Sequence, residues 1–388
     1  MSDYIPEEIL VEIFLRLPPK SLAEFRRVCK SWYSLIDDPD FISKYNLLRM
    51  KNVDNSKLIM RQYDKCNKHE LFQLYQDQLD SFSAFKAIDF PLDKERAPYQ
   101  IIGLCCGLAT FIGFPVRGVA KCIVIWNPSL GSCVRIPAKY FPNIHSEPFY
   151  GFGFDPKTTD YKIVRVVFRE GHSVPIRPRT YFVDVFALKV GNWKDITATV
   201  VPPCVFADKT PQAYVNGAIH WVGHDERGLG FWRRTVLAVF DLSEEVFKEF
   251  DIPNEVKTRE VAYEKMQKLF VGVFDQTLAL MHYYTQWYNS PSYDGCCIWM
   301  MKEYGVVDSW TKQFKIDLRL GLGKMVGLRK NGEVLLVTRY NGELVSYDTK
   351  RRKFQKLDTF CIDSSFYLDI YMESLVLMKR VNWCFTDA

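Results

Sequence analysis

The first 45 residues carry more apolar surface at helical spacing than so short a segment can bury by itself. The opening stretch places six apolar side chains on one wide stripe: Ile5, Ile9, Leu10, Ile13, Phe14 and Leu17. A unit of this size rarely folds alone without disulfides, a metal or a partner. The pattern therefore predicts a detachable helical docking module, with another polypeptide covering its surplus apolar face. An ordinary core face is the alternative.

Local signals predict where these helices begin and end. Pro18 and Pro19 stop the first helix, because proline lacks the N–H that a helix interior needs. Ser21, with Glu24 three residues later, has the pattern of a capping box, so we expect the second helix to begin at Ser21. That helix would end before Asp37 and present seven apolar residues on one face: Leu22, Phe25, Val28, Cys29, Trp32, Leu35 and Ile36.

The order of these residues resembles the F-box over nearly all of residues 4–43, with no gap. The resemblance implies a three-helix motif that binds a Skp-type adaptor. That adaptor bridges to a cullin and a RING-bearing subunit in an SCF ubiquitin ligase. By motif position, ten residues would contact the adaptor or support the helices that do: Pro6, Ile9, Ile13, Leu17, Pro18, Leu22, Phe25, Val28, Cys29 and Trp32.

From about residue 57 the pattern changes to alternation and short apolar runs separated by turn signals, which is typical of β-structure. Five stretches each hold about four short strands: 101–137, 150–197, 213–253, 268–317 and 325–357. A sixth is split, with residues 57–90 completed by two strands from 366–378. Pairing first with last would leave no long exposed edge.

The predicted fold class is therefore mainly β, with a three-helix N-terminal module followed by a β-propeller-like domain of about six blades. A seven-bladed ring and an irregular pair of β-sandwiches stay open as alternatives. We expect the F-box at residues 1–45, a linker at 46–56, the β-propeller-like domain at 57–380 and a C-terminal tail at 381–388.

The β-region resembles the plant F-box-associated, kelch-like domain. The motifs that carry this resemblance lie at 127–129, 151–156, 160–165, 216–221, 241–247, 298–314 and 373–377. It implies a substrate-recruiting domain fused to the F-box. Two groups are similar: one that restrains plant immune signalling (the constitutive-expresser-of-pathogenesis-related-genes type) and the pollen S-locus F-box proteins. The segment 298–314 favours the first.

Composition narrows the class of protein further. The chain has 51 basic and 46 acidic side chains, and its net charge of +5 does not indicate nucleic-acid binding. Its 11 cysteines lack Cys-x-x-Cys spacing, and the N-terminus lacks the pattern of a signal peptide, so we expect reduced thiols in the cytoplasm and/or nucleus. The longest uncharged run, Tyr99–Val116, contains three glycines and a proline, which favours a buried hairpin over a membrane span.

No motif predicts bond chemistry. His220 and His224 would lie more than about 10 Å apart on a strand, so they do not form a zincin pair. Gly151 with Gly153, and Gly321 with Gly323, indicate turns and do not complete a phosphate-binding loop. We therefore expect no catalytic residue, cofactor or metal.

Three long loops are candidates for the surface that captures a target: 169–179, 224–233 and 286–295. They supply the predicted substrate-binding residues Arg177, Arg179, Arg233, Arg234, Trp287, Tyr288 and Tyr293. The basic run 350–353 indicates a solvated hairpin turn.

The resemblances imply a non-catalytic substrate-recognition subunit of an SCF-type ligase that presents an unidentified protein for ubiquitination, with plant immunity as its setting. Two other functions remain open. One is a β-propeller hydrolase with an incidental helical N-terminus. The other is an F-box binding protein that acts outside any ligase.

Overall fold

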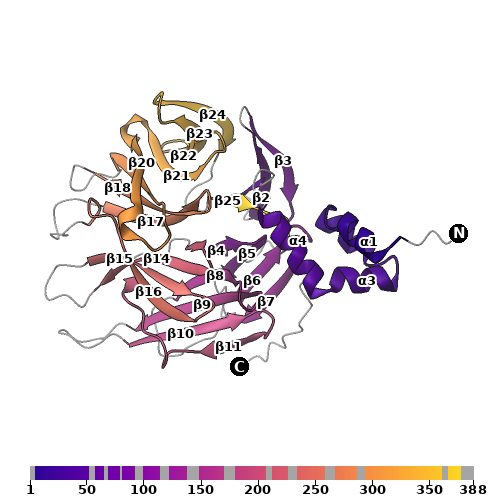
Figure 1. The fold of residues 1–388 in the computed structure, drawn as a ribbon. Coiled ribbons are helices and arrows are strands. Elements are labelled where there is room, and N and C mark those ends of the chain that lie inside the picture. The colour runs from indigo at the N-terminus through magenta and orange to yellow at the C-terminus, as the bar shows by residue number, and fades with distance from the viewer. Residues whose placement is uncertain are drawn as a thin grey trace. The chain divides into compact units, whose positions relative to one another are not determined.

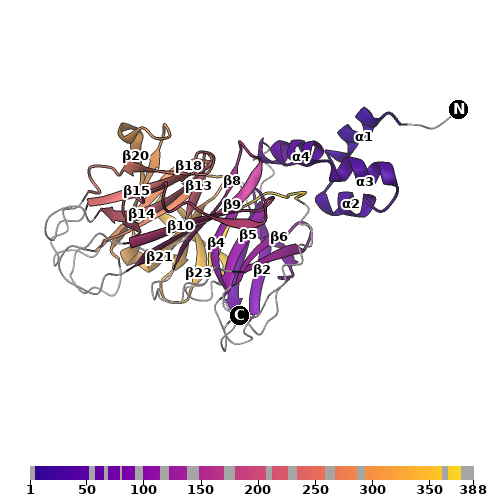
Figure 2. The same ribbon diagram turned by 90° about the horizontal axis from the view of Figure 1, so that it is seen from below.

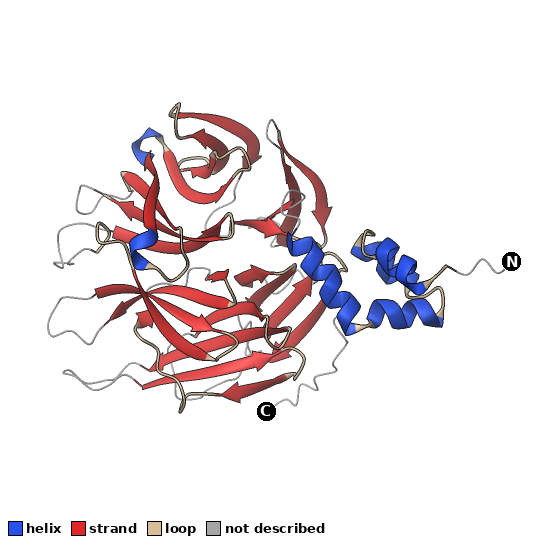
Figure 3. Cartoon of the chain, in the orientation of Figure 1, coloured by secondary structure: helices blue, strands red, loops and turns tan. Residues whose placement is uncertain are grey.

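The computed structural model describes residues 5–51, 57–64, 69–78, 81–91, 99–113, 122–137, 148–169, 180–206, 212–225, 234–257, 267–285, 293–360 and 366–376. The chain divides into two compact units. The first consists of Met1–Tyr140 with Ile362–Ala388, and the second of Phe141–Cys361. Helices lie at the N-terminal end and the remainder is β-structure (Figures 1 and 3).

Four helices open the first unit: α1 (Glu7–Phe14), α2 (Pro19–Phe25), α3 (Lys30–Asp37) and α4 (Pro39–Lys51). Figures 1 and 2 both show α1, α2 and α3 gathered at one end of α4. The three-helix expectation thus gains a fourth helix. Residues 46–51, the first part of the predicted linker, belong to it.

The predicted second helix is in fact two helices. α2 begins at Pro19 and has no side-chain capping bond, so the expected capping box at Ser21 is wrong. Proline is pre-organised for the first helical position, and the preceding Pro18 is extended, as residues before proline usually are. The chain then turns after Phe25, and extended Cys29 precedes α3. The apolar residues keep their helical spacing across this interruption, so spacing alone did not predict two separate helices.

Two antiparallel sheets complete the first unit. One has the order β25-β1-β2-β3, built from β25 (Tyr367–Tyr371), β1 (Lys57–Asp64), β2 (His69–Asp77) and β3 (Phe82–Ile88). The other runs β4 (Tyr99–Cys105), β5 (Leu108–Gly113), β6 (Cys122–Asn127) and β7 (Ser132–Pro137). The predicted pairing of last strand with first is confirmed, since β25 pairs with β1. The described residues of the C-terminal stretch supply one strand, where we expected two.

Four antiparallel sheets form the second unit, and one gains short extra strands. They comprise β8 (Phe149–Asp155), β9 (Asp160–Arg169), β10 (Thr180–Ala187) and β11 (Asn192–Asp195); β12 (Val205–Phe206), β13 (Ala213–Val215), β14 (Ala218–Asp225), β15 (Arg234–Asp241) and β16 (Val246–Asp251); β17 (Gln267–Phe274), β18 (Thr277–Tyr284), β19 (Gly295–Met301) and β20 (Trp310–Asp317); and β21 (Leu322–Leu328), β22 (Val334–Thr338), β23 (Glu343–Asp348) and β24 (Lys353–Phe360). The described residues form six sheets, which confirms the prediction of about six blades.

Glycines occupy positions where the backbone has a positive φ or where a neighbouring side chain leaves no room for a Cβ atom. Asn216 and Gly217 have φ of 52° and 72°, the paired positive values of a tight hairpin turn, as predicted. Gly151 and Gly153 differ from our expectation, because they lie inside β8 and not in turns. A Cβ on Gly151 would lie 2.4 Å from the Trp221 ring, so this glycine lets the aromatic side chain of the next sheet pack against β8.

Cores lie between neighbouring sheets. Val164, Val183 and Val185 of one sheet pack with Val236 and Phe240 of the next. The buried hairpin β4–β5 confirms our interpretation of the longest uncharged run. Each sheet thus uses its apolar side chains on its neighbours in the same unit.

Candidate functional site: the apolar face of the helical module

The helical module has a small core of its own. Phe14, Leu22, Ile36 and Tyr45 are fully buried in it. Trp32 lies half-buried at its edge, with its ring 5.1 Å from that of Phe14 in an edge-on contact. Tyr45 donates a hydrogen bond to the Leu17 carbonyl at 2.8 Å, which fixes the end of α1 against α4. The module therefore has a packed core, and the apolar side chains that it leaves exposed are not part of that core.

These exposed apolar side chains are concentrated on α1. Ile9 and Ile13 are 52% and 43% exposed, and Ile5 precedes them at the same four-residue spacing. Val28, between α2 and α3, is 62% exposed. Scattered exposed apolar residues are ordinary on a protein surface, but here Ile9 and Ile13 lie one turn apart on α1, and Ile5 comes shortly before the helix. Fully burying one such side chain contributes about 1.5–3 kcal/mol, so this face can anchor a partner.

The ten predicted adaptor residues divide into three groups. Exposed side chains are those of Pro6, Ile9, Ile13, Pro18, Val28 and Cys29. Half-buried ones, packed on the module's own core, are Leu17, Phe25 and Trp32. Leu22 is fully buried, so in this chain it supports the helices. Contact with an adaptor stays a prediction for all ten.

A segment from the far end of the chain completes the module's core. Leu375 is fully buried within the cluster formed by the N-terminal helices. Its N–H donates to Oδ1 of Asn46 in α4 at 3.1 Å, and Ser374 Oγ lies 3.4 Å from the same oxygen. The core of residues 1–45 thus includes a side chain from outside the segment, and the detachable module stays a prediction.

The same segment is tied to the β4–β7 sheet. Asn127, the last residue of β6, donates from Nδ2 to the carbonyls of Ser374 and Val376 at 3.1 and 3.0 Å. Ser129 Oγ lies 2.5 Å from the Tyr371 hydroxyl and accepts from the Ser374 N–H at 3.0 Å. Residues 371–376 thus join α4 to the β-structure of the first unit. Sequence reasoning missed this role, although motifs 127–129 and 373–377 were visible.

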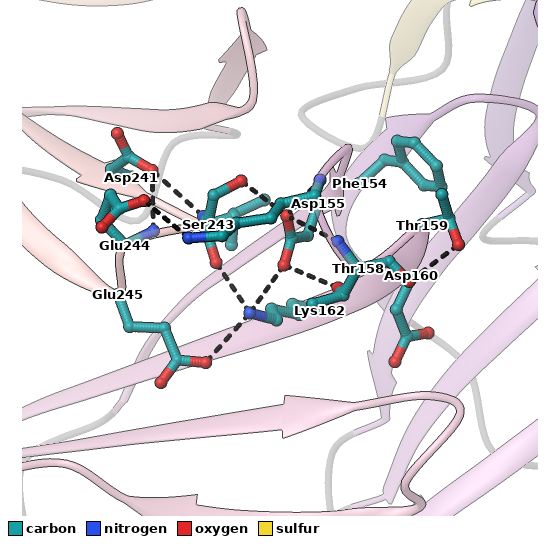
Figure 4. Close-up of polar contacts among 12 residues, drawn as sticks. Phe154, Asp155, Thr158, Thr159, Asp160, Lys162, Asp241, Ser243, Glu244 and Glu245 are labelled. Carbon is teal, nitrogen blue, oxygen red and sulfur yellow. Dashed lines mark hydrogen bonds and ion pairs between the residues drawn. The ribbon is translucent and has the colours of Figure 1, made fainter.

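Figure 4 shows a group of charged side chains that lies between the β8–β9 hairpin and the β15–β16 turn. Lys162 Nζ lies 2.9 Å from Asp155 Oδ2 and 3.0 Å from Glu245 Oε1, and it donates to the Leu242 carbonyl at 2.7 Å. Asp155 also accepts from Ser243 Oγ at 2.6 Å and from Thr158 Oγ1 at 2.7 Å.

This group is a cross-link between two sheets and not an acid–base pair. Burial opposes ionisation of Asp155, but hydrogen bonds from Ser243, Thr158 and Lys162 outweigh it and hold its pKa below the usual range. The pKa of Lys162 is raised, because bonds to Asp155 and Glu245 outweigh its own burial. Each charged group is thus held in its ionised form by the others, and neither acid is poised to exchange a proton near neutral pH.

The two histidines are structural, as predicted. His220 is fully buried, with Nδ1 3.1 Å from the Ala213 carbonyl and Nε2 2.9 Å from the Tyr304 hydroxyl. Burial lowers its pKa to about 4. His224 Nδ1 lies 3.3 Å from Thr235 Oγ1. Among the described residues, no group of three His, Cys, Asp or Glu side chains is placed to hold a metal ion.

The predicted target-binding residues fall mostly outside the described ranges: Arg177, Arg179, Arg233, Trp287 and Tyr288. Arg234 is described and exposed, but it pairs with Glu249 and, at 3.1 Å, with Asp251. Tyr293 is half-buried, with its ring 5.5 Å from that of Tyr283. The basic run at 350–353 follows the prediction and forms the turn between β23 and β24.

Comparison with known proteins agrees with this two-part organisation. The chain matches the F-box domain over residues 3–44 and the F-box associated beta propeller domain over residues 105–378. F-box protein CPR1 of Arabidopsis thaliana is 29% identical, over 96% of this chain and 89% of its own length. F-box protein At4g22390 of the same plant is 25% identical, over 96% and 90%. Both resemblances noted in the sequence are thereby confirmed.

Solved structures add little. An α-L-arabinanase of Penicillium chrysogenum complexed with arabinobiose has a TM-score of 0.40 and 10% identity, over 64% of this chain and 76% of its own. The α-L-arabinofuranosidase ARB93A of Fusarium graminearum has a TM-score of 0.39 and 11% identity, over 66% and 78%. Likenesses this weak carry no argument about activity. None of the described helices has the length and apolar character needed to cross a bilayer.

Proposed function

Because the chain belongs to the F-box associated beta propeller family and opens with an F-box, we propose that it is a substrate-recognition subunit of an SCF-type E3 ubiquitin ligase. In this role the F-box docks a Skp-type adaptor, and through it a cullin and a RING subunit. The β-domain holds a target protein. The pairing of an F-box with a propeller domain, and relatives that are themselves F-box proteins, support this adaptor role.

The observation that carries the proposal is the apolar face of Ile5, Ile9, Ile13 and Val28. The core of the module is already completed by Leu375, so these side chains are not needed to fold it. Helix-in-groove recognition uses anchors at this four-residue spacing and draws its affinity from a few of them. A partner that provides such a groove would remove these side chains from water.

Under this proposal, catalysis is a matter of proximity. The chain would hold its target near a ubiquitin-charged enzyme carried by another subunit, which raises the effective concentration of the reacting groups. No residue of this chain would form or break a bond. The buried bridge through Leu375 and Asn46 would fix the orientation of the F-box on the first unit's sheets.

We extend the proposal to plant immune signalling and to the cytoplasm and/or nucleus. The support is the resemblance of residues 298–314 to the immune group. Most of that segment's apolar side chains, including Trp299 and Trp310, are buried in the β17–β20 sheet. The resemblance therefore concerns packing, and the identity of the target must come from the surface.

A reconstituted ligase tests the proposed function. Ile9→Asp/Ile13→Asp places two charges on the exposed face and should abolish capture of the full chain by a purified Skp-type adaptor and cullin. Val190→Asp, at a side chain that is 76% exposed in the β10–β11 turn, is the matched control and should bind as the wild type does. Adaptor capture unaffected by the paired substitution, in a folded protein, would refute the docking face.

Capture alone does not separate a ligase subunit from a binder that acts elsewhere. Proximity labelling in plant cells with the proteasome blocked should enrich a protein whose lifetime lengthens with Ile9→Asp/Ile13→Asp. If the labelled protein has the same lifetime in cells with the wild-type chain and in cells with Ile9→Asp/Ile13→Asp, a role in degradation would be contradicted.

A further inference from the structure

A pocket of about 350 Å³ in the second unit is lined by residues of both the β17–β20 and β21–β24 sheets. Its walls carry three cations, Lys315, Arg319 and Arg352, and two carboxylates, Asp294 and Asp317. Asp294 is the described end of the predicted target loop 286–295. The pocket therefore adjoins a surface that the sequence already marked for target binding.

Two of these charges neutralise each other. Arg319 donates to the Asp317 carboxylate through Nε at 2.9 Å and Nη2 at 2.7 Å, a two-point contact. The pKa of Asp317 is lowered by this contact, in spite of some burial. Asp294 accepts from Thr285 Oγ1 at 3.2 Å. Asp317 is therefore paired with Arg319, whereas the Asp294 carboxylate keeps its charge, so the three cations and two carboxylates leave the pocket walls with one net positive charge.

Among the described residues, the other two cations have no carboxylate at hydrogen-bond distance, although Arg352 contributes to the lowered pKa of Asp317. Within the described ranges, Lys315 and Arg352 form no hydrogen bond or ion pair. Their neighbours differ: Lys312, on the same strand as Lys315, pairs with Glu255, and Arg351 lies 3.6 Å from Asp348. The positive charge left over is thus specific to the two side chains that line the pocket.

The edge of the pocket is apolar. Leu320, in the short 3₁₀ turn η4 (Leu318–Leu320), is largely exposed. The half-buried Tyr284 ring lies so close to Gly295 that a Cβ there would be 2.3 Å from its hydroxyl. An occupant would therefore meet two cations inside and one aliphatic side chain at the rim.

We propose that this pocket binds an anionic side chain of the target protein, with an adjacent apolar residue of the target packed on Leu320. The inference rests on the proposed function, in which the β-domain holds a target. A guanidinium and an ammonium group form charge-assisted hydrogen bonds with a carboxylate or with a phosphoryl group. Either acidic residues or a phosphorylated residue could supply that chemistry.

Peptide binding to the full chain tests the pocket. Three rhodamine-labelled peptides of the form Gly-X-Leu-X-Gly carry Glu, phosphoserine or Gln at X, and fluorescence anisotropy follows binding up to about 1 mM peptide. We expect the anionic peptides to bind and the Gln peptide not to bind. If the Glu peptide binds, acidic segments suffice; if only the phosphoserine peptide binds, the pocket requires a phosphorylated target.

Matched variants separate the pocket from general charge attraction. Lys315→Glu/Arg352→Glu should weaken anionic peptide binding by at least about tenfold. Lys350→Glu/Arg351→Glu makes the same change in charge on the adjoining turn, outside the pocket, and should change binding by less than about threefold. Equal losses in both variants, or no binding of either anionic peptide by the wild type, would overturn the proposal.

Adaptor capture, measured on the same proteins, keeps the two proposals apart. Retained capture together with charge-independent peptide binding would refute the pocket alone. Loss of capture by the wild-type chain would refute the ligase role, whatever the peptides do.

Discussion

The F-box and the β-sheets differ in how completely they bury their apolar side chains. In the sheets they interleave with the next sheet, as Val164 and Val236 do, and both are fully buried. In the F-box a small core is completed by Leu375, while Ile9 and Ile13 remain half-exposed. The sheets bury their apolar side chains within their own unit, whereas the described F-box residues leave part of their apolar surface exposed.

Buried polar contacts follow the same division. The sheets of the second unit are cross-linked by ion pairs with little or no exposure, such as Arg165–Asp184 and Lys162–Asp155. The described F-box helices are joined by apolar contacts, by hydrogen bonds from Tyr45 and Arg49 to the Leu17 carbonyl, and by partly exposed ion pairs such as Arg26–Asp37. Substitutions should therefore affect one region at a time.

The largest expected effect is in the sheets. Arg165→Leu leaves the buried Asp184 carboxylate without the guanidinium that now lies 2.5 Å away. Removing one member of a buried pair costs about 3–5 kcal/mol of unfolding free energy. Urea unfolding should show this loss, and Arg165→Leu/Asp184→Leu should recover part of it. At urea concentrations at which the variant is still folded, it should bind the adaptor as the wild type does. Loss of adaptor binding by the folded variant would show that the sheets and the F-box are not independent.

A comparable substitution at the bridge should affect the F-box instead. Leu375→Ala removes a fully buried side chain from the F-box core and should cost about 3 kcal/mol. Hydrogen exchange should speed up in α1–α4 while the β17–β24 sheets stay protected. Leu344→Ala, an equally buried deletion in β23, is the control and should do the reverse. Unchanged exchange in α1–α4 would show that the bridge is dispensable.

Acid should weaken the sheets through His220, and the F-box contains no histidine. Burial lowers the pKa of His220 to about 4, so between pH 6.5 and 4 the unfolded chain takes up a proton that the folded chain does not. Stability is therefore lost as pH falls through this window, by about 3 kcal/mol for this site.

His220→Gln should reduce that slope. His282, whose pKa burial and Lys312 also lower to about 4, should retain the other part. Equal slopes in His220→Gln and wild type, from denaturant unfolding across this pH range, would show that His220 does not drive the acid sensitivity.

The smallest expected effect is at a hairpin turn. Asn216 has a φ of 52°, a left-handed conformation that costs most other residues about 1–2 kcal/mol. Asn216→Ala should lower the unfolding free energy by about 1 kcal/mol, whereas Asn216→Gly should be nearly neutral. A destabilised glycine variant would mean that the Asn side chain, and not its backbone angle, matters at this turn.

Local patterns explain why so much of the fold was predictable. The six blades, the turn at 216–217 and the split sheet follow from alternation and turn residues within short windows. The features that the sequence did not predict correctly are a local helix start and a contact between residues far apart in the chain. The capping box at Ser21 was displaced by a proline-initiated helix, and the bridge joins Asn46 to Leu375 across 329 positions. No periodicity connects residues so far apart.

The candidate site shows the same limit. The F-box residues could be named from their order, but only packing separated exposed Ile9 and Ile13 from buried Leu22. Arg234 is a predicted target-binding residue, yet two carboxylates of β16 engage it. Lys315 is not among the predicted site residues. A single lysine in a strand gives no indication of a binding site in the sequence, because its pocket forms only when two sheets come together.

Hydrogen exchange of the full chain, with and without a purified Skp-type adaptor, tests the central claim most directly. The account predicts new protection in residues 5–17 and 25–33, with little change across the β-strands. Protection confined to the β-domain, or none anywhere at saturating adaptor, would contradict the claim that the exposed apolar face of α1 is completed by another polypeptide.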